Sequence, residues 1–245
     1  MTFLPRSPFL LLVRPWMGIY TLLLCVLLTT VVIAGCGPAP NRSLTLEEAK
    51  VLKYRVTVNG VAFDIPVNYS HREYAMFKRW PSPTKEELEG RVRRKVDVIK
   101  IVVLMPDMEP YTERNAKEFD RHDWGDKVSI FMTTSRADWE YYYRYTVPLL
   151  QRLPDIAEMP GMYRYRDPAL SQIVYLSHKQ PASSVTRIIC PDQSKAPSPY
   201  CKVDTQYTDH FDLKVAFSQK HLGHWRMIDR KVKSLLNNLK VESSS

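Results

Sequence analysis

Histidine and carboxylate pairs occur at spacings that metal sites and acid–base catalysts use. His221 and His224 lie three residues apart, but no glutamate stands between them to act as the base of a zinc hydrolase. Asp107 and Glu109 could act as paired carboxylates, yet two flanking prolines indicate a surface turn. The sequence Asp-Arg-His-Asp at 120–123 could orient an imidazole, but a polar loop explains it equally well. We therefore expect no metal site and no cofactor.

Sequence motifs of the common enzyme classes are absent as well. The chain has no G-x-S-x-G nucleophile elbow, no H-E-x-x-H zinc motif and no phosphate-binding or dinucleotide-binding glycine loop. No serine or cysteine stands where a neighbouring histidine would activate it. We expect a protein that is not an enzyme and acts by binding. A periplasmic enzyme without a recognised motif is the least favoured alternative, after the two binding or structural roles given below.

One run of aromatic residues is the strongest candidate for a partner interface. It comprises Trp139, Tyr141, Tyr142, Tyr143, Arg144 and Tyr145. In a helix or in a strand these side chains must point in different directions, so one core cannot bury them all. Exposed tyrosine, tryptophan and arginine are favoured at protein interfaces. The alternative is that half of them pack inward and the others are ordinary surface tyrosines.

The N-terminal 35 residues have the order of a secretory signal. Arg6 and Arg14 precede an almost entirely apolar stretch, Met17 to Ile33, and no acidic residue occurs before Glu47. An uncleaved anchor helix over residues 15–41 is the alternative, because about 20 apolar residues span a bilayer. The small residues that end the apolar stretch favour cleavage. We predict a signal peptide at residues 1–35.

The end of this signal indicates lipid attachment. Residues 33–36 read Ile-Ala-Gly-Cys and resemble the bacterial lipobox, in which the cysteine becomes the first mature residue and carries lipid. We therefore predict lipidation of Cys36, a tether over residues 36–50 and a membrane contact through the lipid anchor. Residue 37 is glycine and not aspartate, which implies an outer-membrane lipoprotein on the periplasmic side of the envelope.

Cys190 and Cys201 form an even pair in an exported protein, so we predict a disulfide. Two zinc ligands are the alternative, but a zinc site would need two further ligands, and the chain has no C-x-x-C. The simplest geometry is a hairpin closed by the bridge, with residues 188 and 203 opposite each other.

The mature chain has clear strand and helix patterns at both ends. Residues 54–58 and 61–65 alternate around Asn59-Gly60, which predicts a hairpin with a type I′ turn. Residues 211–217 also alternate, with one apolar face formed by Phe211, Leu213, Val215 and Phe217. From about 221 to 240, apolar residues at spacings of three and four predict an amphipathic helix. Its basic residues could contact a partner or simply face solvent.

The middle of the chain is harder to interpret. Residues 98–104 are rich in β-branched side chains and predict a buried central strand. Residues 128–132, 173–176 and 185–189 also predict strands, and 84–87 resembles a helix start. Residues 139–153 fit either a strand or a helix, 154–167 reads as a loop, and a subdomain boundary could lie near 154–170. We predict one periplasmic domain of the α+β class over 51–245, with a division into two subdomains as the alternative. Its sheet is mostly antiparallel and carries the C-terminal helix.

The charge of the chain is positive but dispersed. The net charge is +9, and it is +7 once the two arginines of the leader are removed. The longest basic cluster is residues 91–95, interrupted by Val92. Because a nucleic-acid binder concentrates its charge on one face, we expect no nucleic-acid partner. Mixed charge of this kind suits a soluble domain near an anionic surface or an acidic partner.

Two segments add a family resemblance. Residues 54–66 read Y-R-V-T-V-N-G-V-A-F-D-I-P, and residues 221–229 read H-L-G-H-W-R-M-I-D after an alternating strand. With the lipoprotein signal, this layout resembles periplasmic immunity lipoproteins encoded beside phospholipase effectors of type VI secretion systems. Of the family's functional residues, Cys36 alone transfers. The resemblance implies binding and neutralisation of a cognate lipase. A structural lipoprotein of an envelope or secretion assembly is the alternative.

Overall fold

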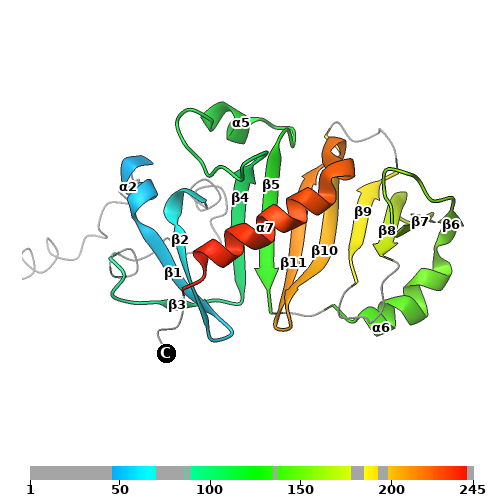
Figure 1. Ribbon diagram of the computed structural model, residues 1–245, viewed down its shortest axis with the longest axis horizontal. Coiled ribbons are helices and arrows are strands. Elements are labelled where there is room, and N and C mark those ends of the chain that lie inside the picture. The colour runs from blue at the N-terminus through cyan, green and yellow to red at the C-terminus, as the bar shows by residue number, and fades with distance from the viewer. Residues whose placement is uncertain are drawn as a thin grey trace, which may run out of the picture. The chain divides into compact units, whose positions relative to one another are not determined.

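Figure 1 shows a computed structural model of the chain. The chain divides into two units, residues 1–44 and 45–245. The structure describes residues 46–69, 86, 89–134, 137–177, 185–192 and 198–241, all of them in the second unit. The predicted signal peptide, Cys36 and most of the tether lie outside the described residues, as does the helix start expected at 84–87 except for Glu86.

The main feature of the second unit is an eight-stranded sheet with the order β4-β5-β11-β10-β9-β8-β7-β6. Each strand is antiparallel to its neighbours. The strands are β4 (Val98–Leu104), β5 (Lys127–Thr133), β6 (Gln151–Leu153), β7 (Met162–Asp167), β8 (Gln172–Ser177), β9 (Arg187–Pro191), β10 (Tyr200–Thr208) and β11 (Phe211–Ser218). The predicted α+β class with an antiparallel sheet is confirmed. The strands on both sides of residues 154–161 belong to this one sheet, because β7 pairs with both β6 and β8.

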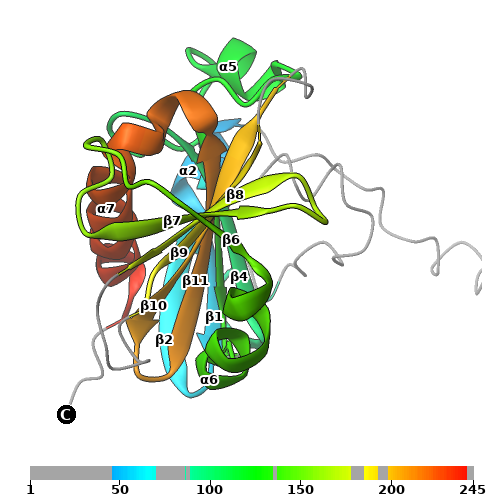
Figure 2. The same ribbon diagram turned by 90° about the vertical axis from the view of Figure 1, so that its right-hand side faces the viewer.

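The C-terminal helix covers one face of this sheet (Figure 2). It begins with a 3₁₀ segment, η5 (Gln219–His224), and continues as α7 (Trp225–Leu239). The buried side chains of α7 are Trp225, Ile228, Val232, Leu236 and Leu239. On β11 the predicted apolar face is fully buried, with Leu213 and Phe217 at 0% exposure. Burial of these two apolar surfaces against each other forms the core.

A smaller sheet flanks the C-terminal end of α7. Its order is β2-β1-β3, formed by β1 (Lys53–Val58), β2 (Val61–Pro66) and β3 (Arg94–Lys95). The predicted hairpin is confirmed, and Asn59 and Gly60 have φ angles of 45° and 80°, as a type I′ turn requires. Helix α2 (Leu46–Val51) precedes the hairpin and the 3₁₀ segment η1 (Val67–Tyr69) follows it. After α7, the Val241 amide donates to the Ala62 carbonyl at 2.9 Å.

Residues 139–153, which fitted either a strand or a helix, form helical turns followed by a short strand. Helix α6 (Trp139–Tyr141) runs into a π-helical turn, η2 (Tyr142–Thr146), and a 3₁₀ turn, η3 (Val147–Leu149), before β6 begins. The side chain of Asp138 caps α6 by accepting from the Tyr141 amide at 2.9 Å. One further short helix, α5 (Ala116–Asp120), precedes β5.

Two strand predictions need correction. Strand β4 exists as predicted but lies at an edge of the sheet, not at its centre. Ile99, Ile101 and Val103 are buried while the residues between them are half-buried, so its β-branched composition concealed an alternating pattern. Residues 162–167 form β7 and not a loop. Met162 is the one fully buried residue of this strand. Because its tyrosines and arginines are half-buried or exposed, its sequence lacks the apolar alternation that predicts a strand.

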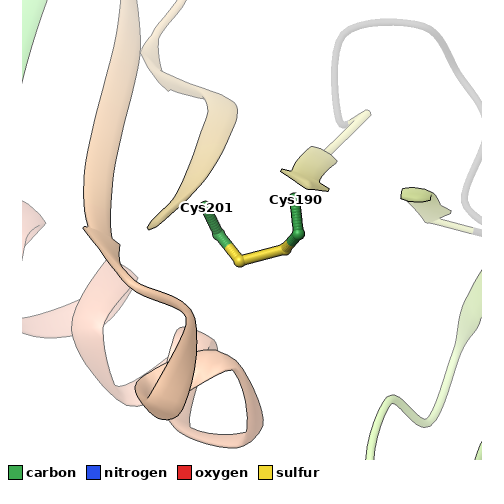
Figure 3. Close-up of a disulfide and its surroundings, with 2 residues drawn as sticks. All are labelled: Cys190 and Cys201. Atoms are coloured by element: carbon green, nitrogen blue, oxygen red, sulfur yellow. A yellow bond between two sulfur atoms is a disulfide. The ribbon is translucent and has the colours of Figure 1, made fainter. Parts of the chain in front are cut away.

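The hairpin of β9 and β10 carries the disulfide (Figure 3). Ile188 pairs with Val203, which confirms the predicted register. The sulfur atoms of Cys190 and Cys201 are bonded at 2.04 Å, and the two Cα atoms are 4.3 Å apart. Both cysteines are buried, on the side of their strands that also carries the buried residues Ile188 and Val203. The bridge therefore joins β9 to β10 at the end where the loop between them begins.

A candidate partner-binding face

The face of the sheet opposite α7 brings together residues from four strands. Strand pairing places one cross-strand row in the order Lys100, Phe131, Lys214 and Asp204. A neighbouring row runs from Ser129 through Ala216 to Lys202. These residues alternate along their strands with the buried residues beneath α7, so they point to the other side. We call this surface the open sheet face.

The open sheet face contains a depression of about 480 Å³. Small buried residues, Ser129 and Ala216, form its floor. Trp124 and Tyr200 form one wall, and their rings stack with centroids 4.6 Å apart at 25°. The backbone amide of Trp124 donates to the Ser198 hydroxyl at 2.7 Å, which fixes the loop before β5 against the start of β10. One wall of the depression is therefore an aromatic pair, and a hydrogen bond holds the backbone of its Trp124.

Lysines surround this depression. Lys202 and Lys214 are exposed, and Lys100 is half-buried. The Lys100 ammonium lies 5.1 Å from the centre of the Phe131 ring, and that of Lys202 lies 5.5 Å from the Tyr200 ring. Burial lowers the pKa of Lys100 to about 8, because desolvation penalises its charged form. Lys100 and Lys202 thus hold cationic groups over aromatic rings.

The carboxylate that lines the depression, Asp204, is already paired within the protein. The Arg187 guanidinium donates to Asp204 at 2.9 Å from Nε and 2.6 Å from an Nη. Both side chains are mostly buried, at 21% and 14% exposure. Because this pair is neutral overall, the net charge of the residues that line the depression is that of three lysines, Lys100, Lys202 and Lys214.

The predicted aromatic interface lies beside the open sheet face and is divided in two. Trp139 and Tyr142 point inward, with their ring centres 5.3 Å and 4.5 Å from the Arg187 guanidinium. Tyr141 and Tyr145 point outward, at 59% and 54% exposure. Arg187 thereby connects the inward aromatics to Asp204 on the open sheet face.

The outward tyrosines form a small exposed ridge. The ring centroids of Tyr141 and Tyr145 are 4.8 Å apart. Beside them, exposed Arg144 forms an ion pair with Glu140 at 2.9 Å. Tyr143 is half-buried, and burial raises the pKa of its hydroxyl. Part of the aromatic run 139–145 therefore packs inward and part is exposed, so each of the two alternatives describes some of its residues. The role of this run as a partner interface remains a prediction.

Sequence reasoning missed the open sheet face itself. The alternation of β11 showed that Lys214 and Ala216 point away from the buried side, but not which strands lie beside them. Trp124, Phe131 and Tyr200 are isolated aromatics in the sequence, and pairing of β5, β11 and β10 places them together. No local motif carries that information.

Residues considered above as catalytic candidates, such as His221 and Asp123, form structural contacts. His221 Nε2 lies 2.9 Å from Asp126 Oδ1, and the Lys220 ammonium lies 2.8 Å from the same oxygen. Arg121 pairs with Asp123 at 2.8 Å. Within the described residues, no group of three or more histidine, cysteine, aspartate or glutamate side chains is placed to hold a metal ion. No helix in the same part of the chain has the length and apolar content needed to cross a bilayer.

Comparisons with known proteins identify structural neighbours at low sequence identity. No protein-family model matches the chain, and no curated protein sequence matches it. The chain is similar in structure to Smlt3025, an immunity protein of the Stenotrophomonas maltophilia type IV secretion system. The identity is 13%, the TM-score is 0.52, and the match covers 78% of this chain and 94% of that one. A second similarity, with 16% identity, a TM-score of 0.47 and the same coverage, is to the Neisseria meningitidis iron-regulated outer membrane lipoprotein FrpD. At such identities the likeness concerns the fold alone.

Proposed function

We propose that this chain is a lipid-anchored immunity protein that binds and neutralises a secreted effector in the periplasm. The open sheet face is the observation that carries the proposal, because it offers aromatic anchors and cationic groups around a depression. The fold gives further support, since Smlt3025 is an immunity protein of a type IV secretion system. Immunity proteins therefore occur on this architecture.

The identity of the effector is a finer part of the proposal. The sequence resemblance points to a phospholipase effector of a type VI system, whereas the structural neighbour belongs to a type IV system. Both kinds of effector would be met by a protein in the periplasm. We propose the phospholipase as partner, bound in a stoichiometric complex that blocks its access to lipid.

Co-expression with the effector encoded by the neighbouring gene tests the proposal. Directed to the periplasm, that effector should stop growth, and the full-length lipoprotein should restore it. Purified together, the two should form a complex whose residual lipase activity falls linearly to zero as the molar ratio approaches one. Inhibition that needs a large excess of the lipoprotein would contradict stoichiometric neutralisation.

A double deletion separates immunity from the structural alternative. Cells that lack both the lipoprotein and the effector should grow normally if the lipoprotein serves only as an antidote. A growth or envelope defect in those cells would instead indicate a structural component of an envelope or secretion assembly. A lipase activity of the purified lipoprotein itself would indicate an enzyme.

Lipid anchoring has its own test. A labelled fatty acid should be incorporated into the wild-type protein and not into Cys36→Ser, because the thiol is the proposed attachment atom. Two acyl chains hold a protein stably at a membrane where one chain is marginal. Fractionation should find the wild type in the outer membrane. Absence of label in the wild type would refute the anchor without affecting the proposed effector binding.

A further inference from the structure

The open sheet face has the charge and shape of a site for an acidic polypeptide segment. Its exposed cationic groups are Lys202 and Lys214, which come from adjacent strands, and Lys100 lies further along the same face. The carboxylate that lines its depression, Asp204, is already held by Arg187 at 2.6 Å. A ligand that complements this face must therefore supply negative charge of its own.

The shape of the face favours an acidic polypeptide segment over an anionic bilayer as its ligand. Its aromatic groups, Trp124, Phe131 and Tyr200, are half-buried and line a depression whose floor is Ser129 and Ala216. A flat bilayer would meet the rim of such a depression but could not fill it. A volume of about 480 Å³ is instead in the range of sites that hold a few inserted side chains.

We infer that the open sheet face binds an acidic segment of the effector, one that inserts an apolar or aromatic side chain between Trp124–Tyr200 and Phe131 and places carboxylates on Lys202 and Lys214. This inference rests on the proposed function and adds the chemistry of the partner segment. The contacts would be ion pairs at the rim and a desolvated anchor at the centre. The lysines would steer the encounter, because surface charge acts mainly on the association rate.

Charge reversal at the rim tests this inference. In the full-length lipoprotein, Lys202→Glu combined with Lys214→Glu should weaken binding to the catalytically inactivated effector by about tenfold or more, because like charges would then meet at the interface. Binding of the wild type should also weaken as salt is raised, since exposed charges are screened. Both positions are exposed, so the unfolding midpoint of the variant should stay close to that of the wild type.

A matched control carries the same change in charge elsewhere. Arg230→Glu combined with Lys240→Glu alters two exposed basic residues, one on α7 and one just after it. This variant should bind the effector as the wild type does. Equal loss in both variants would show that net charge alone matters and would overturn the assignment to the open sheet face. Loss in the control only would place the effector at α7 and overturn it as well.

A synthetic acidic polypeptide tests the inference without knowledge of the effector. The wild type should bind a random copolymer of glutamate and tyrosine, and the Lys202/Lys214 reversal should bind it at least about tenfold more weakly than the control variant. No difference between the variants would refute the inference even if the effector itself is inhibited. Failure of the effector to bind, together with selective binding of the copolymer, would contradict the proposed function and leave the acidic-segment site standing.

Vesicles of phosphatidylglycerol test the competing membrane surface. We expect the reversal and control variants to bind these vesicles equally, since a bilayer cannot enter the depression. Selective loss of vesicle binding in the Lys202/Lys214 reversal would overturn the inference, because it would assign the face to anionic lipid.

Discussion

Removal of the Cys190–Cys201 bridge should destabilise the protein by an amount that the loop length determines. The cysteines are 11 positions apart in the sequence. In the chain-entropy model, closing a loop of this size lowers the entropy of the unfolded chain and stabilises the fold by about 3 kcal/mol at 25 °C. For a domain of this size that corresponds to a midpoint about 6–12 °C lower without the bridge. The bridge would then supply a large share of a typical domain's stability of about 5–15 kcal/mol.

Two perturbations separate the covalent link from packing. Both cysteines are buried, with exposures of 1% and 0%, so the reduced protein should be prepared by unfolding in reductant and refolding. Reduced wild type keeps both sulfur atoms and loses only the link. The double variant Cys190→Ala and Cys201→Ala also loses buried atoms and should be less stable than the reduced wild type.

Equilibrium urea unfolding, followed by far-ultraviolet circular dichroism, measures both differences. The oxidised protein should exceed the reduced one by about 3 kcal/mol in unfolding free energy. A difference below about 0.5 kcal/mol would refute the loop-entropy argument, because that argument predicts about six times this amount. The bridge also anchors β10 at Cys201, next to Tyr200, which stacks on Trp124. Reduction should therefore weaken effector binding more than it disturbs α7.

Three further predictions concern the core and the open sheet face. Ile228→Ala, at a fully buried position, should lower the unfolding free energy by about 2–5 kcal/mol, while exposed Arg230→Ala should change it by less than about 0.5 kcal/mol in the same urea titration. A double-mutant cycle of Arg187→Ala and Asp204→Ala should give a coupling energy of about 1–3 kcal/mol, since removing one partner leaves the other buried; near-zero coupling would contradict the ion pair. Lys100→Met should stabilise the protein at pH 7, where wild-type Lys100 is charged and partly desolvated. Because burial lowers the pKa of Lys100 to about 8 in the folded protein while the unfolded value stays near 10.5, the folded chain loses this proton first as the pH rises. The stabilising effect of Lys100→Met should therefore shrink from pH 7 to pH 10.5, and an effect that grows over this range would refute the assignment.

Local sequence patterns predicted the strands and the helix that have one apolar and one polar side. Asn59-Gly60 defines its turn through backbone freedom alone, and the alternation of residues 211–217 identifies a buried face without knowledge of the neighbours. The C-terminal helix is equally local, because spacings of three and four place its apolar residues on one side. Strand β7 was missed since it lies next to the edge strand and buries little apolar surface.

What the sequence alone determined is therefore the class of the fold, the C-terminal helix, the register of the disulfide hairpin and the expectation of lipid at Cys36. What the tertiary structure decided is the position of β4 at the edge and the gathering of Phe131, Tyr200 and the lysines on one face. The physical reason is the range of the interactions. A turn or an amphipathic stripe depends on residues a few positions apart, whereas the open sheet face depends on pairing between strands that lie far apart in the chain.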